Sequence, residues 1–125
     1  MGAAESINRA LNTFFNGFGI PGYLEDNIPP TASLPYLTYK PAVSGGWNEE
    51  ASFHGRLWYP SSAGRLPILQ TEDQISAALA GGLTVPCEGG AILLRKGTPW
   101  AQPVDNPPEG YLCEYLNFEI TQLCE

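Results

Sequence analysis

Residues 109–122 read EGYLCEYLNFEITQ, and this stretch decides the fold class. Four of its five even-numbered positions from Leu112 to Ile120 are apolar, which is the two-residue period of a β-strand with one buried face. The remaining even-numbered position is an acid, Glu114. We therefore predict a long final strand whose apolar even-numbered side chains face the core.

Four further extended segments precede this strand. Residues 83–87 (LTVPC) and 91–96 (AILLRK) flank residues 88–90 (EGG), and a short glycine-containing connection between two apolar runs predicts a β-hairpin. Residues 34–40 (LPYLTYK) and 51–59 (ASFHGRLWY) are rich in aromatic residues and alternate with a two-residue period. We predict a strand in each of the four segments.

The segment 51–59 is expected to have two unlike faces. One face holds Phe53, Leu57 and Tyr59. The other face holds His54, Arg56 and Trp58. Gly55 between them marks a position where the strand could bulge or bend.

Two segments carry the spacing of an amphipathic helix. Residues 3–16 place Ile7, Leu11, Phe14 and Phe15 at helical intervals. Gly17, Gly19 and Pro21 follow and favour a helix end. Residues 71–80 begin with Thr71 three positions before Gln74, the spacing of a capping box, and predict a second helix.

The order of these elements predicts the α+β class, with a mixed, mainly antiparallel sheet of about five strands packed with two helices. We expect a single domain over residues 1–125. Residues 20–35 and 97–108 are rich in proline, so we predict an ordered loop or extended arm in the first and a loop in the second. The predicted core consists of Ile7, Leu11, Phe14, Leu37, Leu57, Ile75, Leu79, Ile92, Leu94, Leu116, Phe118 and Ile120.

Charge and composition exclude several classes of protein. Six Lys and Arg residues against 13 Asp and Glu residues give a formal net charge of −7, and the basic residues are scattered, so a nucleic-acid-binding surface is not expected. No apolar run reaches the roughly 18 residues of a membrane span, and no signal peptide is recognisable, which predicts a cytosolic protein without a membrane partner. Three widely spaced cysteines favour reduced thiols over a disulfide framework.

Residues 17–22 (GFGIPG) match the letters of the dinucleotide-binding pattern G-x-G-x-x-G. A dinucleotide site needs those glycines after a strand and before a helix, whereas here they follow a helix, and Pro21 removes one backbone donor. We interpret the stretch as a helix end followed by a turn, and we expect no nucleotide cofactor.

Metal and catalytic chemistry have little support in the sequence. His54 is the single histidine, and neither it nor the three cysteines show the close spacing of metal ligands, so no metal cofactor is expected. The acidic pairs Glu49-Glu50 and Glu114/Glu119 are interpreted as solvated charges, because no spacing selects one of them for acid–base chemistry. A spatially assembled Cys–His site stays open as an alternative.

The aromatic residues are the strongest indication of a binding surface. Core packing competes for most of the three Trp and six Tyr residues, but Trp47 and Trp100 lie in long loops at 41–50 and 97–108. A tryptophan on a conformationally restricted loop is a typical interface anchor. The candidate subunit or partner interface is Trp47, Glu49, Glu50, Trp100 and Gln102.

An ordered series of short phrases resembles small phage and prophage morphogenesis proteins. The phrases follow a helix and are FGIPGY (18–23), PYLTY (35–39), LWY (57–59), GGAI (89–92), KGTPWAQ (96–102) and YLN (115–117). They resemble tail-terminator or head–tail joining proteins of long-tailed, non-contractile phages. The likeness spans residues 10–120 and consists of packing and turn phrases, none of which is a catalytic signature.

This resemblance implies a structural virion-assembly protein without enzymatic activity. It implies a small α+β subunit that forms a ring with its own copies, commonly a hexamer in this family, and contacts the tail tube protein and the head connector protein. DNA would pass through such a ring without specific binding, and an acidic lumen would suit that passage. The implied locations are the host bacterial cytoplasm during assembly and the head–tail junction of the virion.

Other functions stay open at this point. A different head–tail connector component, acting in head closure, fits the same phrases. A small carbohydrate- or protein-binding module would need two or three tryptophans exposed on one face. A small enzyme would need His54 or a cysteine at the floor of a pocket with a shifted pKa.

Overall fold

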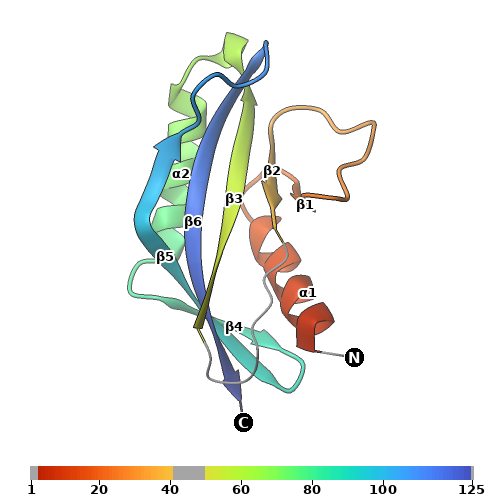
Figure 1. The fold of residues 1–125 in the computed structure, drawn as a ribbon, viewed down its shortest axis with the longest axis vertical. Helices are drawn as coiled ribbons and strands as arrows, with labels where there is room; N and C mark the ends of the chain where they lie inside the picture. The colour runs from red at the N-terminus through yellow and green to blue at the C-terminus, as the bar shows by residue number, and fades with distance from the viewer. Residues whose placement is uncertain (1–2, 41–49, 125) are drawn as a thin grey trace.

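The computed structural model describes residues 3–40 and 50–124, which form two α-helices and one six-stranded sheet (Figure 1). In chain order the elements are α1 (Ala3–Phe15), β1 (Gly22–Leu24), β2 (Tyr36–Tyr39), β3 (Glu50–Pro60), a 3-10 turn (Ser61–Ala63), α2 (Leu66–Ala78), β4 (Leu83–Cys87), β5 (Gly90–Pro103) and β6 (Tyr111–Cys124). The strand order is β1-β2-β3-β6-β5-β4. β1 and β2 are parallel and all other pairs are antiparallel, which confirms the predicted α+β class.

The final strand, β6, lies at the centre of the sheet between β3 and β5. Its register with β3 pairs Phe53 with Phe118 and Leu57 with Glu114, so the even-numbered positions of β6 share a face with the apolar positions of β3. Leu116, Phe118 and Ile120 are at most 2% exposed. The predicted burial of the even-numbered face is confirmed.

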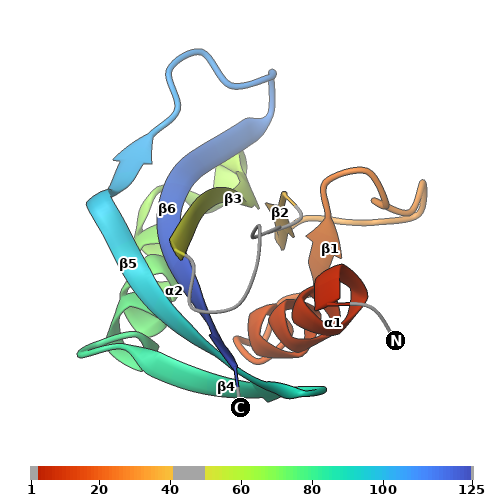
Figure 2. The same ribbon diagram turned by 60° about the horizontal axis from the view of Figure 1, so that its bottom comes forward.

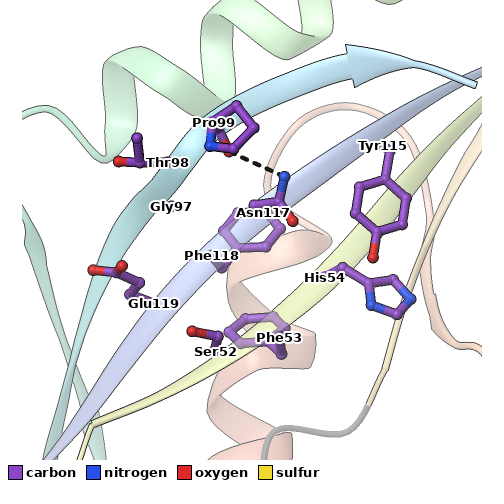
Figure 3. Close-up of a pocket in the computed structure, with 10 residues that line it drawn as sticks. All are labelled: Ser52, Phe53, His54, Gly97, Thr98, Pro99, Tyr115, Asn117, Phe118 and Glu119. Carbon is purple, nitrogen blue, oxygen red and sulfur yellow. Dashed lines mark hydrogen bonds between the residues drawn. The ribbon is translucent and has the colours of Figure 1, made fainter.

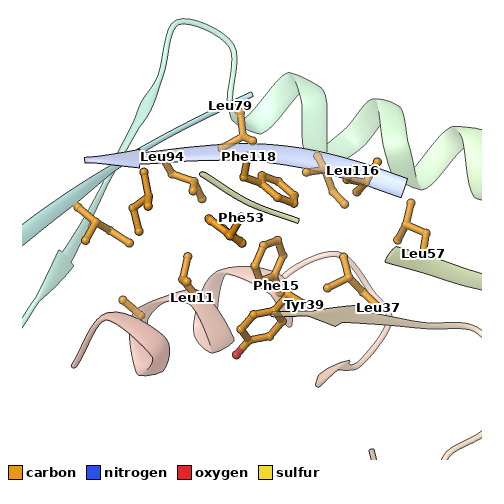
Figure 4. Packing of buried hydrophobic residues seen from close by; sticks show 14 of the residues in the cluster. Leu11, Phe15, Leu37, Tyr39, Phe53, Leu57, Leu79, Leu94, Leu116 and Phe118 are labelled. Carbon is orange, nitrogen blue, oxygen red and sulfur yellow. The ribbon is translucent and has the colours of Figure 1, made fainter. Parts of the chain in front are cut away.

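Both helices pack on this same face of the sheet. The ring of Phe15 from α1 lies 5.2 Å from that of Phe118 and 4.8 Å from that of Tyr39. From α2, the Thr71 hydroxyl is hydrogen-bonded to the Tyr59 hydroxyl. Figure 4 shows side chains of both helices gathered with those of β2, β3 and β6 in one cluster. Neither described helix covers the opposite face.

The sheet is strongly curled (Figure 2). Helix α1 contacts both β1 and β4, which are the two edge strands. The Ser6 hydroxyl accepts a hydrogen bond of 2.7 Å from the backbone N–H of Glu88, at the turn of the β4–β5 hairpin. One helix therefore closes the open side of the curled sheet.

The core agrees closely with the prediction. Eleven of the twelve predicted core residues are buried, and the twelfth, Phe14, packs against the core with its ring 5.1 Å from that of Phe15. Five large residues that the predicted core omits are also buried, namely Phe15, Tyr39, Phe53, Tyr59 and Ile68.

Two element boundaries differ from the prediction. The stretch 20–35 contains a short strand, β1, held to α1 because the Asn16 side chain both donates to and accepts from the backbone of Gly22. Helix α2 begins at Leu66, with Pro67 in its first turn, so the predicted capping box at Thr71 is wrong. Thr71 lies inside the helix, and its hydroxyl is hydrogen-bonded to that of Tyr59 on β3 instead of capping the helix.

The predicted loop at 97–108 is also wrong over its first half, because β5 continues to Pro103. The register between β5 and β6 shifts between Lys96 and Ala101, so residues 97–100 bulge opposite the single residue Asn117. β3 pairs continuously with β6 and has no bulge at Gly55. The loop predicted at 41–50 lies outside the described residues except for Glu50.

Candidate functional site

The face of the sheet opposite the helices carries a group of half-buried aromatic side chains, which we call the aromatic face. It consists of Tyr23, Tyr36, Trp58, Tyr111 and Tyr115. The register places them together, because Tyr36 pairs with Trp58 across β2 and β3, and Arg56 pairs with Tyr115 across β3 and β6. The outward positions of His54, Arg56 and Trp58 on β3 confirm the face predicted for them.

The rings of the aromatic face pack edge to face. Tyr23 and Tyr36 have ring centroids 5.9 Å apart, and Trp58 and Tyr111 have the same separation. The Trp58 indole N–H donates a hydrogen bond of 3.0 Å to the Thr38 hydroxyl. Burial and the nearby Tyr111 and Tyr23 hydroxyls raise the pKa of Tyr36. The surface is therefore preorganised rather than a set of loose side chains.

Arg56 joins the aromatic face to an acidic partner. Its guanidinium lies 2.6 Å from the Glu25 carboxylate, and its Cζ lies 5.6 Å from the centroid of the Tyr115 ring, a cation–π arrangement. His54 stacks on the other side of the group, with its ring 4.8 Å from that of Tyr115. Burial, and then the positive charge of Arg56, lower the pKa of His54, while the Glu25 carboxylate opposes part of this shift.

The β5 bulge forms the wall of a polar pocket beside His54 (Figure 3). The pocket has a volume of about 260 Å³ and includes His54, Asn117 and Glu119. Asn117 donates a hydrogen bond of 3.0 Å to the Pro99 carbonyl, which fixes the bulge. A Cβ on Gly97 would lie 2.9 Å from the Cβ of Asn117, so the bulge requires glycine there.

A second pocket lies at the Trp58 end of the aromatic face, and we call it the Trp58 groove. Its volume is about 270 Å³, and its apolar walls are Ile28, Tyr36, Trp58, Pro108 and Tyr111. Its polar lining residues are Glu25, Thr38 and Arg56. Because Glu25 pairs with Arg56 and Thr38 accepts from Trp58, these polar groups already have partners.

Two chemical properties of the described residues bear on this site. In residues 3–40 and 50–124 no group of three or more His, Cys, Asp and Glu side chains is placed to hold a metal ion. Burial raises the pKa of Cys113 to about 11, which keeps its thiol protonated and poorly nucleophilic. No helix of the described chain is long and apolar enough to cross a membrane.

The structure describes some of the predicted interface residues and not others. Trp47 and Glu49 lie outside the described residues. Glu50 is exposed at the start of β3 and pairs with Arg95, and Gln102 is exposed on β5 opposite Tyr115, beside the aromatic face.

Trp100 does not match its predicted placement on an exposed loop. It lies on β5, half-buried, with its ring 5.3 Å from that of Phe118 on the core side of the sheet. The expectation of an exposed loop anchor at Trp100 is therefore wrong, because the bulge turns this side chain inward.

Sequence reasoning also missed a pair of carboxyl groups between α2 and β6. The interpretation of Glu114 as a solvated charge is wrong, because Glu114 is 4% exposed and its carboxyl interacts with that of Glu72. Burial, then the Glu114 charge, raises the pKa of Glu72 to about 7. Arg65 lies 3.8 Å from Glu114 and compensates part of the remaining negative charge. The acid on the apolar face of residues 109–122 was the signal for this pair.

Comparison with known proteins supports the fold. No protein-family model matches the chain, and no curated protein matches it. One solved structure, whose name states no function, is similar over 97% of this chain and 94% of its own, with a TM-score of 0.60 and 15% sequence identity. At that identity the likeness concerns the fold alone, and it establishes that this arrangement of two helices on a curled sheet occurs in another protein.

Proposed function

We propose that the protein is a structural virion-assembly component, a tail-terminator ring subunit at the head–tail junction of a phage or prophage. The observation that carries the proposal is the aromatic face. Five aromatic rings and Arg56 lie together on a sheet face that neither described helix covers. Tyr, Trp and Arg are the residue types that dominate binding energy in protein interfaces.

The arrangement of the polar groups also supports an interface. Arg56 is paired with Glu25, and the Trp58 N–H is paired with Thr38, so a partner could cover this face without leaving those groups unpaired. Unpaired buried charges would oppose association much more strongly than paired ones.

The charge of the chain suits a conduit for DNA. The formal net charge is −7, and a ring of such subunits would repel the phosphate backbone instead of holding it. In this proposal the ring contacts the tail tube protein on one side and the head connector protein on the other. A head-closure role in the same junction is the nearest variant of it.

The test is the state of assembly of the purified chain. Mass measured by light scattering over a range of concentrations, alone and with the tail tube protein, should reveal a closed oligomer. Electron microscopy of that oligomer should then show rings with a central opening. A chain that forms no ring under either condition, and whose loss leaves phage tails complete, would refute the proposal.

A carbohydrate-binding module is the second candidate, and the Trp58 groove is the observation that favours it. Aromatic walls from Trp58 and Tyr111 beside a polar group, Glu25, could stack against a sugar ring. Titration with a panel of oligosaccharides should quench the intrinsic tryptophan fluorescence if this candidate is correct. Unchanged fluorescence throughout the panel would favour the ring subunit.

A further inference from the structure

Two exposed apolar features remain at one end of the molecule. Among the described large hydrophobic residues, Leu66 is 66% exposed and Ile28 is 38% exposed, while the others are at least half-buried. Leu66 is the first residue of α2. Ile28 forms a wall of the Trp58 groove. A single exposed leucine is ordinary on a protein surface, so its meaning depends on what complements it.

The Trp58 groove has the properties of a receptor for one aliphatic side chain. Its volume of about 270 Å³ corresponds to roughly nine liquid waters, and its walls are mainly apolar. Three of its polar residues, Glu25, Arg56 and Thr38, have partners inside the subunit through the Arg56–Glu25 and Trp58–Thr38 contacts. An apolar side chain could therefore enter the groove without separating these two pairs.

The two features belong to different segments of the chain. In Figure 1, α2 begins at the upper left, whereas the segment that carries Ile28 projects at the upper right, beyond β2. Leu66 is not among the residues that line the groove of its own subunit. Contact between two unlike patches is heterologous, and such contacts close into rings when the rotation between subunits allows it.

Charges around the two features are complementary. Arg65 precedes Leu66 with its side chain 47% exposed, and the first turn of α2 has no acidic residue. The groove is bordered in sequence by the exposed acids Asp26, next to Glu25, and Glu109, next to Pro108. Opposite charges at the rim would guide the approach and orient the two copies.

We infer that Leu66 of one subunit inserts into the Trp58 groove of a second copy of this chain, and that this contact repeats around the ring. The inference rests on the proposed function and names the two surfaces that join neighbouring subunits. In this inference the groove binds Leu66 of a second copy of the chain, and it does not bind a sugar or a different protein.

Two charge-bearing variants test this pairing. Leu66→Glu removes the inserted side chain but keeps the groove, and Ile28→Glu alters the groove but keeps Leu66. Each variant alone is expected to remain monomeric. An equimolar mixture should form one-to-one pairs and nothing larger, because only one intact contact can form per pair. Native mass spectrometry resolves these species if one variant carries an isotope label.

A matched control separates the contact from general charge effects. Gln70→Glu adds the same charge on an exposed position of α2, one turn beyond Leu66, and should assemble like the unaltered chain. Melting curves of all three variants should match that of the unaltered chain, because each substitution is at the surface. Leu66→Ala should weaken association by about five- to thirtyfold, as expected for loss of a partly buried leucine.

The outcomes distinguish this inference from the proposed function. Rings formed equally by the unaltered chain and by Leu66→Glu would overturn the inference while the ring function stands. One-to-one pairs in the mixture, with open filaments from the unaltered chain, would support the contact and refute the ring. A chain that stays monomeric up to about 1 mM would overturn the inference, and phage tail completion would then decide the function separately.

Discussion

The carboxyl pair between α2 and β6 predicts how stability depends on pH. Glu72 has a pKa of about 7 in the folded protein against 4.5 as its reference value, so the folded state binds this proton more tightly than the unfolded state. Stability from this group is therefore fully present below pH 4.5 and is lost as the pH rises to about 7. The full shift would correspond to about 3 kcal/mol, and solvent screening of the half-buried Glu72 reduces it to about 1–2 kcal/mol.

Glu72→Gln is the perturbation that isolates this effect. A glutamine is neutral at every pH and its amide can donate to the Glu114 oxygen that has no donor in the described residues. We expect the variant to be more stable than the unaltered chain by about 1–2 kcal/mol at pH 8. The advantage should shrink at pH 5, where the unaltered Glu72 is already protonated when folded.

Thermal unfolding followed by circular dichroism at pH 5 and pH 8 measures the effect. For a domain of this size 1 kcal/mol corresponds to about 3–5 °C in Tm, so the variant should melt about 3–10 °C higher at pH 8. Asp105→Asn is the matched control, because it removes one carboxylate from an exposed position. If the Tm difference between Glu72→Gln and the unaltered chain is the same at both pH values, the pKa of Glu72 is not raised in the folded protein.

Three further substitutions test the packing. Phe118→Ala should lower the free energy of unfolding by about 3–5 kcal/mol in denaturant titrations, since its ring contacts Phe15, Phe53 and Trp100; a loss below 1 kcal/mol would contradict its central place. Trp100→Ala should lower the free energy of unfolding by about 1–2 kcal/mol because its ring packs on the core. An unchanged Tm would show that the Trp100 ring does not pack on the core. Gly97→Ala should cost about 1–3 kcal/mol through the clash with Asn117, and a neutral result would mean that the bulge can relax.

Periodicity predicted those parts of the fold where burial is one-sided. The alternation in 109–122 gave the central strand and its buried face, because only one face of this sheet is covered by helices. The spacing of Ile7 and Leu11 gave α1 for the same reason. In each case the sequence pattern directly reflects the burial that the structure produces.

The errors come from tertiary contacts that override local signals. Thr71 carries a capping-box spacing, yet a buried hydroxyl pair with Tyr59 places it inside α2. Prolines at 99 and 103 indicate a loop, yet a strand tolerates them at a bulge and at its end. Rules based on local sequence cannot predict these positions, because the residues that contact them are distant in sequence.

The candidate site was only partly predictable, and the reason lies in which face of β3 the helices leave open. The outward set His54, Arg56 and Trp58 was expected from alternation, but alternation does not say whether a second layer will cover it. That depends on both helices packing on the other face, which Phe15 and Thr71 establish through contacts across the sheet. Once both helices are assigned to that face, Trp58 rather than Trp100 is the tryptophan of residues 3–40 and 50–124 that faces away from the core. The proposed interface is therefore a strand face built by cross-strand pairing, and a rigid surface of this kind requires less ordering on association than a loop would.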